Sequence, residues 1–135
     1  MPVVKKKKTR RKRRGHYHRG VHSSPKAGDC SYRSGWELVY MQWLDANPAV
    51  LKYSYEGLII EYVSNIRTGK LRKYYPDFMV DYEGRQELIE IKPAKRVTQV
   101  KVAKKLKAAE AWCKTHGVTF KVITEKELKV LGILK

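Results

Sequence analysis

The sequence is poor in cysteine, in long apolar runs and in acidic residues. Its two cysteines, Cys30 and Cys113, lie far apart and form no CxxC pair, which excludes a disulfide scaffold and a zinc ribbon. No stretch reaches the roughly 18 apolar residues needed to cross a bilayer, and the N-terminus lacks the apolar core of a signal peptide. We therefore expect a protein of the reducing cytoplasm that has no membrane partner.

Positive charge is what the sequence has in excess. Its 135 residues include 30 Lys and Arg against 13 Asp and Glu, which gives a formal net charge of +17. Such a balance favours a polyanionic partner, most simply a nucleic acid. A hydrophobic fraction of 42%, with three Trp and nine Tyr, is still enough to bury the core of one domain.

The charge is concentrated at the N-terminus, where residues 5–14 carry nine positive charges in ten positions. Self-repulsion and the lack of apolar groups predict a disordered basic arm over residues 1–30, followed by a folded domain over residues 31–135. The arm suits sequence-independent contacts with DNA phosphates. Nuclear targeting and simple solubility are alternative roles for the same run.

Hydrophobic periodicity predicts a mixed α/β fold in the order α-β-β-β-α-β. A helix begins after Ser34, which forms a capping-box pattern with Glu37, and ends before Pro48. Strand-like runs follow at residues 51–63, 71–82 and 85–93, and they are joined by turns at Gly69 and Gly84. A helix over residues 97–116, a strand over residues 118–123 and a short helix after Thr124 complete the domain.

The turn at Glu83 and Gly84 places two carboxylates opposite each other. In a two-residue hairpin turn here, facing residues have numbers that sum to 167, so Asp77 faces Glu90. Lys92 projects onto the same face as Glu90, because side chains alternate along a strand. A divalent cation would relieve the repulsion between the carboxylates, and hard oxygen ligands suit Mg²⁺. These parts fit metal-assisted hydrolysis of a phosphodiester.

Each of these residues also has a simpler interpretation. An Asp on a sheet face is usually solvated, and Glu90 with Lys92 matches an ordinary same-face ion pair. Glu37 matches a helix cap through its spacing from Ser34. Periodicity alone leaves these alternatives open.

The ordered set of motifs resembles the PD-(D/E)XK nucleases. Residues 32–37 (YRSGWE), 74–78 (YYPDF), 88–93 (LIEIKP) and 108–128 are similar to the head-completion nucleases of tailed phages and to TnsA-type transposase endonucleases. The resemblance implies a restriction-endonuclease-like core with a mixed sheet. It also implies a Mg²⁺-dependent deoxyribonuclease, with Mn²⁺ able to substitute for Mg²⁺.

The resemblance also assigns roles to individual residues. It implies that Asp77 and Glu90 hold the metal together with the backbone carbonyl of Ile91. Lys92 would then position or activate the attacking water, and Glu37 would complete the acidic cluster from the helix.

The remaining expectations concern partners. Basic residues flank the expected site and are candidates for contacts with a DNA duplex: Arg33, Arg72, Lys73, Lys95, Arg96, Lys101, Lys104 and Lys105. We expect cleavage of DNA ends or branches with low sequence specificity, because no recognition helix or zinc finger is evident. Phage head or portal proteins and a second copy in a homodimer are further expected partners, with a location in the host cytoplasm or the virion. The rival is a non-catalytic nucleic-acid-binding protein of a virion or ribosome.

Overall fold

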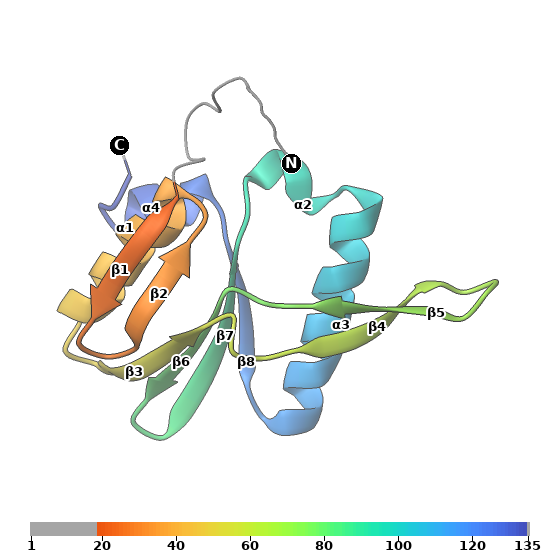
Figure 1. The fold of residues 1–135 in the computed structure, drawn as a ribbon, viewed down its shortest axis with the longest axis horizontal. Coiled ribbons are helices and arrows are strands. Elements are labelled where there is room, and N and C mark those ends of the chain that lie inside the picture. Colours follow the sequence, from red (N-terminus) through yellow and green to blue (C-terminus); the bar gives the residue numbers. More distant parts are fainter. Residues whose placement is uncertain (1–18, 135) are drawn as a thin grey trace, which may run out of the picture.

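A computed structural model describes residues 19–134 of the chain. The elements in order are β1 (Gly20–Ser24), β2 (Gly28–Tyr32), α1 (Gly35–Ala46), β3 (Val50–Tyr55), β4 (Ile60–Asn65), β5 (Lys70–Tyr74), β6 (Phe78–Tyr82), β7 (Arg85–Ile91), α2 (Ala94–Val97), α3 (Val100–His116), β8 (Thr119–Ile123) and α4 (Glu125–Val130) (Figure 1). Within the described part, no helix combines the length and apolar character that a membrane crossing requires.

The central sheet has the strand order β3-β6-β7-β8. The first three strands pair antiparallel, and β8 joins β7 in parallel because α3 provides the crossover between them. The mixed sheet and the alternation of helices and strands confirm the predicted α/β class. The predicted Ser34 cap is present, because Ser34 Oγ accepts from the Glu37 amide. Gly117 ends α3 with a left-handed φ of 69°.

Helices cover both faces of this sheet. On one face, Met41 and Leu44 of α1 and Leu128 of α4 pack against Phe78 and Ile89 and are fully buried. On the other face, Leu88 packs against Ala109 and Cys113 of α3. Strand alternation in the sequence is consistent with a single buried face, and the structure corrects this: β7 ends in a run of five buried residues, as expected for a strand covered on both sides.

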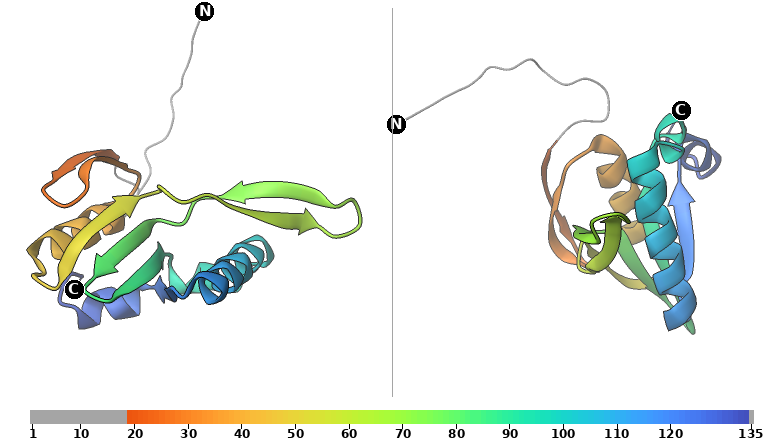
Figure 2. Two further views of the ribbon diagram at one scale, coloured as in Figure 1. Left: turned by 90° about the horizontal axis from the view of Figure 1, so that it is seen from below. Right: turned by 90° about the vertical axis from the view of Figure 1, so that its right-hand side faces the viewer.

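The two long strands predicted at residues 51–63 and 71–82 are each broken in two, which corrects the sequence interpretation. The first run divides into β3 and β4, and the second run divides into β5 and β6. β3 and β6 pair within the central sheet, whereas β4 and β5 pair with each other in a separate antiparallel hairpin. One break contains Glu56, with a φ of 55°, and the other contains Pro76, which has no amide to donate to a ladder. The β4–β5 hairpin crosses α3 and projects beyond it (Figures 1 and 2).

Order begins well before the predicted domain boundary at residue 31. β1 and β2 form an antiparallel hairpin, with Gly20 paired to Tyr32 and Ser24 paired to Gly28, so residues 20–30 are not part of a disordered arm. The hairpin is held by α1, because Lys26 Nζ donates to the carbonyls of Leu44 and Asn47 at the end of that helix, at 2.9 and 2.6 Å. The basic run at residues 5–14 lies outside the described residues.

Candidate active site

The β6–β7 hairpin brings the two predicted carboxylates together. Gly84 takes a left-handed φ of 81° in the turn, and the pairs from Tyr82–Arg85 to Phe78–Ile89 follow the predicted register. One step beyond Phe78, the Asp77 amide donates to Glu90 Oε1 at 3.3 Å. The predicted juxtaposition of Asp77 and Glu90 is therefore confirmed.

Asp77 is held rigidly at the start of β6. Its side chain is buried, with a relative exposure of 6%, and its Oδ2 accepts from the Ile91 amide at 2.7 Å. Its carbonyl accepts from the Glu56 amide at 2.8 Å. The Ile91 amide thus orients the carboxylate and the Glu56 amide fixes the backbone that carries it, which a catalytic or metal-binding group requires.

Glu90 lies between Lys92 and Tyr74. The Lys92 ammonium is 3.5 Å from Glu90 Oε2, and both side chains are largely buried. Burial raises the pKa of the Glu90 carboxyl, and the nearby Tyr74 hydroxyl is one of the groups that oppose this rise. Among the described residues, Tyr74 Oη is the buried side-chain oxygen or nitrogen that lacks a hydrogen-bond partner. The sequence interpretation missed Tyr74.

The electrostatics of the pair are unfavourable in the absence of a cation. Burial, the Glu90 charge and the Glu37 charge raise the pKa of Asp77 well above its usual range, against the opposing effects of the Ile91 amide and Lys92. Burial also raises the pKa of Glu90, although Lys92 and Tyr74 oppose this. Two adjacent buried carboxylates with raised pKa values are typical of functional sites.

Glu37 approaches the pair from α1 but is engaged elsewhere. Its Oε1 accepts from the Tyr55 hydroxyl at 2.7 Å and from the Arg33 amide at 2.8 Å. Only one half of the predicted capping box is formed, the bond from the Glu37 amide to Ser34 Oγ. In the other half, the Glu37 carboxylate accepts from the amide of Arg33, one residue before the Ser34 cap. Glu37 still influences Asp77 through its charge.

Glu56 is a further carboxylate that the sequence interpretation missed. It forms an ion pair with Arg33 at 3.1 Å, and burial together with the Glu37 charge raises its pKa against the opposing effect of Arg33. Its φ of 55° is unusual for a residue with a side chain. Gly57, which follows Glu56 directly, is a turn signal that could have marked this break in the strand-like run of residues 51–63.

Most of the predicted basic residues line one groove. This groove, of about 990 Å³, lies between the β4–β5 hairpin and α3, and its basic lining includes Lys70, Arg72, Lys73, Lys101, Lys104 and Lys105. Burial lowers the pKa of Lys105, and the charges of Lys92 and Glu90 also act on it, so Lys105 links the groove electrostatically to the carboxylates. Lys95 and Arg96 lie on α2 outside the groove lining, and Arg33 is paired with Glu56.

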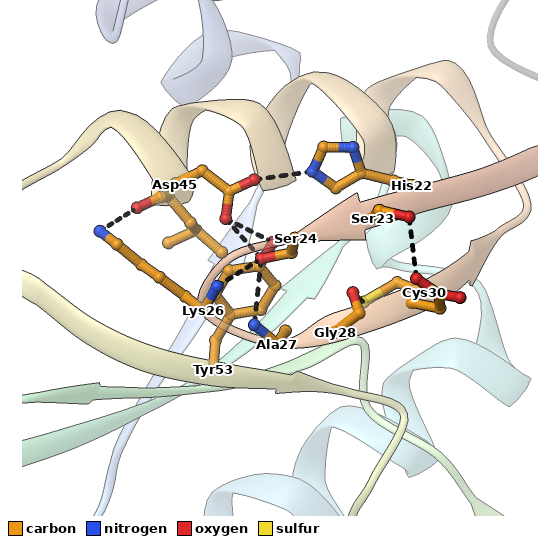
Figure 3. Close-up of polar contacts among 11 residues, drawn as sticks. His22, Ser23, Ser24, Lys26, Ala27, Gly28, Cys30, Asp45 and Tyr53 are labelled. Carbon is orange, nitrogen blue, oxygen red and sulfur yellow. Dashed lines mark hydrogen bonds and ion pairs between the residues drawn. The ribbon is translucent and has the colours of Figure 1, made fainter.

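A second carboxylate cluster lies where the β1–β2 hairpin meets α1 (Figure 3). Asp45 accepts from Ser24 at 2.6 Å and from Tyr53 at 3.0 Å, and His22 Nε2 lies 2.7 Å from its other oxygen. Burial acts to raise the pKa of Asp45, but the hydrogen bonds from Ser24, His22 and Tyr53 outweigh it and lower the pKa. This cluster joins the hairpin to the helix.

The Asp77–Glu90 pair offers carboxylate oxygens of the kind that hard divalent cations use as ligands. The two carboxylates repel each other, and Tyr74 Oη beside them lacks a partner. Within residues 19–134, no three His, Cys, Asp or Glu side chains are grouped closely enough to hold a metal. Mg²⁺ commonly uses one or two protein carboxylates and keeps several waters, so the pair fits it. A direct metal contact from Glu37 stays a prediction, as does one from the Ile91 carbonyl.

Comparison with known proteins gives the family. Residues 47–125 match the family described as TnsA-like endonuclease N terminal, a range that contains Asp77, Glu90 and Lys92 but not Glu37. The head completion nuclease of Enterobacteria phage T4 is 33% identical over 126 aligned positions, which cover 76% of this chain and 83% of that protein. The chain belongs to the TnsA-like endonuclease family, within the PD-(D/E)XK-like nucleases.

Proposed function

We propose that the protein is a Mg²⁺-dependent DNA endonuclease whose catalytic centre is formed by Asp77, Glu90 and Lys92. The observation that carries this proposal is the pair of adjacent buried carboxylates, with raised pKa values and a lysine 3.5 Å from one of them. A protein that only binds nucleic acid has no need for this repulsive arrangement. The homology to nucleases supports the same activity.

Each residue of the centre has a distinct task in phosphodiester hydrolysis. Asp77 and Glu90 would hold the cation, with the Ile91 carbonyl as a further ligand, and Mn²⁺ would substitute for Mg²⁺. Bound there, the cation supplies Lewis-acid stabilisation of the charge that develops on the phosphate. Lys92 holds the attacking water in line with the phosphorus. A bond from the water oxygen to phosphorus forms as the bond to the 3′ oxygen breaks, the water proton leaves to solvent, and the leaving 3′ oxygen takes up a proton from solvent to become a hydroxyl.

The residues around this centre tune and position it. The negative charge of Glu37 makes the electrostatic potential at Asp77 more negative. Glu37 also accepts a hydrogen bond from Tyr55, which holds the start of α1 against β3. The groove between the β4–β5 hairpin and α3 gives the DNA backbone a basic path toward the carboxylates. Contacts of this kind carry no sequence information, so low sequence specificity is expected.

The biological setting is proposed from the named relative. The relative of phage T4 is a head completion nuclease, and we extend that role to this chain, with processing of DNA ends or branches as the reaction. Phage head or portal proteins would then be partners, in the host cytoplasm or the virion. A homodimer would supply the two active sites that a one-step double-strand break needs.

Cleavage of a supercoiled plasmid tests the activity. The wild-type protein should nick or linearise the plasmid with Mg²⁺ or Mn²⁺ and leave it intact with EDTA. Lys92→Ala and Asp77→Asn should abolish cleavage, whereas Asp45→Asn, which changes a carboxylate outside the centre, should retain it. Tight plasmid binding by wild-type protein without cleavage under any divalent cation would favour the rival, a non-catalytic nucleic-acid-binding protein.

A further inference from the structure

The β4–β5 hairpin is an arm that stands apart from the central sheet. Its two strands pair only with each other, from Ile60–Tyr74 outward to Asn65–Lys70. Ile60 and Tyr74 at its base are buried against α3, and Lys104 Nζ donates to the Ser64 carbonyl at 2.7 Å near its outer end. The outer part projects beyond the helix (Figures 1 and 2). Since a two-stranded hairpin is marginally stable alone, these contacts with α3 hold the arm in place.

The tip of the arm presents an apolar side chain to solvent in an ordered turn. Ile66 is 87% exposed, and Val63 and Leu71 next to it are also exposed. The turn is fixed by Asn65, whose Oδ1 accepts from the amides of Arg67 and Thr68 at 3.0 and 3.3 Å. Ile66 is therefore held outward by local hydrogen bonds at the end of the arm.

The charges around the tip indicate what it contacts. Arg67 follows Ile66 directly, and Lys70, Arg72 and Lys73 continue along β5 toward the active site. The three residues of β5, with Lys101, Lys104 and Lys105 of α3, line the basic groove beneath the arm. An apolar side chain surrounded by cations complements a DNA duplex, in which an anionic backbone encloses apolar base faces.

We propose that the β4–β5 arm is a wedge that inserts Ile66 between base pairs and so directs the nuclease to branched or otherwise unstacked DNA. This inference rests on the proposed nuclease function and names the substrate structure that the same site selects. Insertion of an aliphatic side chain into a base step requires unstacking, which costs a few kcal/mol in an intact duplex. The cost is smallest where stacking is already interrupted, as at a branch point.

The geometry also predicts where the cut falls. The chain runs from Lys70 near the tip through β5 to Asp77, a contour length of roughly 23 Å at about 3.3 Å per residue. Because the basic groove lines the arm over residues 70–73, DNA held in it runs along the arm. At 3.4 Å per base pair, cleavage should fall about seven nucleotides from the branch point at the tip of the arm.

The test uses the full-length chain and two DNA substrates of one sequence, a linear duplex and a Y-shaped branch with 2-aminopurine at the fork. Ile66→Ser removes the wedge at an exposed position, where folding is not at stake. Val130→Ser is the matched control, because Val130 on α4 is also 87% exposed but lies outside the arm. Fluorescence is measured in EDTA, so that unstacking is recorded without cleavage, and cut positions are then mapped with Mg²⁺.

We expect wild type and Val130→Ser to raise the fluorescence at the fork and to prefer the branched substrate by about tenfold or more. Ile66→Ser should lose both effects and still cut the linear duplex at the wild-type rate. Cleavage of both substrates at equal rates by wild type, with no rise in fluorescence, would overturn the wedge and leave the nuclease intact. A rise in fluorescence without cleavage would instead overturn the nuclease and support the wedge.

A competing use of the same apolar tip is contact with a second copy of the chain. Sedimentation of wild type and Ile66→Ser without DNA distinguishes the two uses. Equal masses support the wedge. A dimer that dissociates on the Ile66→Ser change, together with unchanged fluorescence at the fork, would overturn it.

Discussion

Two regions of the protein bury carboxylates in opposite ways. At the junction of the β1–β2 hairpin with α1, Asp45 is surrounded by the donors Ser24, His22 and Tyr53, and its pKa is lowered. In the β6–β7 hairpin, Asp77 lies against Glu90, and burial and repulsion raise its pKa. The donors around Asp45 outweigh the cost of its burial, whereas the hydrogen bonds and the Lys92 ion pair of the Asp77–Glu90 pair do not outweigh burial and repulsion. This contrast distinguishes the structural carboxylate Asp45, which is partly buried, from the carboxylates proposed to be catalytic, which are buried.

The largest expected difference between the two regions is in cleavage. Lys92→Ala or Asp77→Asn should lower the rate of plasmid cleavage by about a hundredfold to a thousandfold or more. This is roughly the loss seen when one group that stabilises transition-state charge is removed. Asp45→Asn should change the rate little. A large rate loss in Asp45→Asn, with the melting temperature retained, would break the contrast.

Glu37 tests how far the catalytic region extends. Glutamine can still accept from Tyr55 and Arg33, so Glu37→Gln should keep the fold and its melting temperature. If the negative charge supports the metal centre, cleavage should fall roughly 10- to 100-fold, as for groups that support metal ligands. Ser34→Ala is the control, because it removes the helix cap and should lower the free energy of unfolding by about 0.5–2 kcal/mol. Unchanged cleavage in Glu37→Gln would restrict Glu37 to positioning α1.

Stability should move in opposite directions in the two regions. Asp45→Ala leaves its donors without an acceptor and should lower the free energy of unfolding by about 1–3 kcal/mol. Asp77→Asn removes repulsion from metal-free protein and should leave the melting temperature unchanged or higher. Denaturant unfolding in EDTA measures both variants. A marked destabilisation by Asp77→Asn would indicate that Asp77 is structural.

The pH dependence of stability gives a smaller but more specific contrast. A carboxyl whose pKa is raised in the fold keeps its proton to a higher pH than in the unfolded chain, so Asp77 and Glu90 should make metal-free protein less stable as pH rises above about 4. Asp45 has a lowered pKa, so its contribution is present above about pH 4 and is lost as pH falls through the folded-state pKa. Between pH 3 and 8, the free energy of unfolding should fall less steeply with rising pH in Asp77→Asn than in wild type. Parallel curves would contradict the raised pKa.

The site was more predictable from the sequence than the surrounding fold. The register of Asp77 and Glu90 follows from strand alternation and one turn at Gly84, which are local properties. The division of the long strands at Glu56 and Pro76 was not predicted, although Pro76 is a signal for a break in a strand. Both halves of each run have strand-like composition, and the packing of the outer halves on α3 is a tertiary contact that this composition does not show.

The β1–β2 hairpin was missed for a related reason. It adjoins a highly basic segment, and its stability comes from Asp45 and the end of α1, contacts that no local pattern shows. Tyr74 was also missed, because its place beside Glu90 depends on the arm bending away from β6. Local periodicity therefore predicts paired residues within one hairpin, whereas partners from other elements require the tertiary structure.

Calorimetric titration with Mg²⁺ and Mn²⁺ tests the central claim, that Asp77 and Glu90 form the metal centre, most directly. Wild type and Asp45→Asn should bind the cation and release protons on binding, because carboxyls with raised pKa values must deprotonate to become ligands. Asp77→Asn should lose both the binding and the proton release. Equal binding by wild type and Asp77→Asn, or no binding by wild type in the presence of DNA, would contradict the assignment.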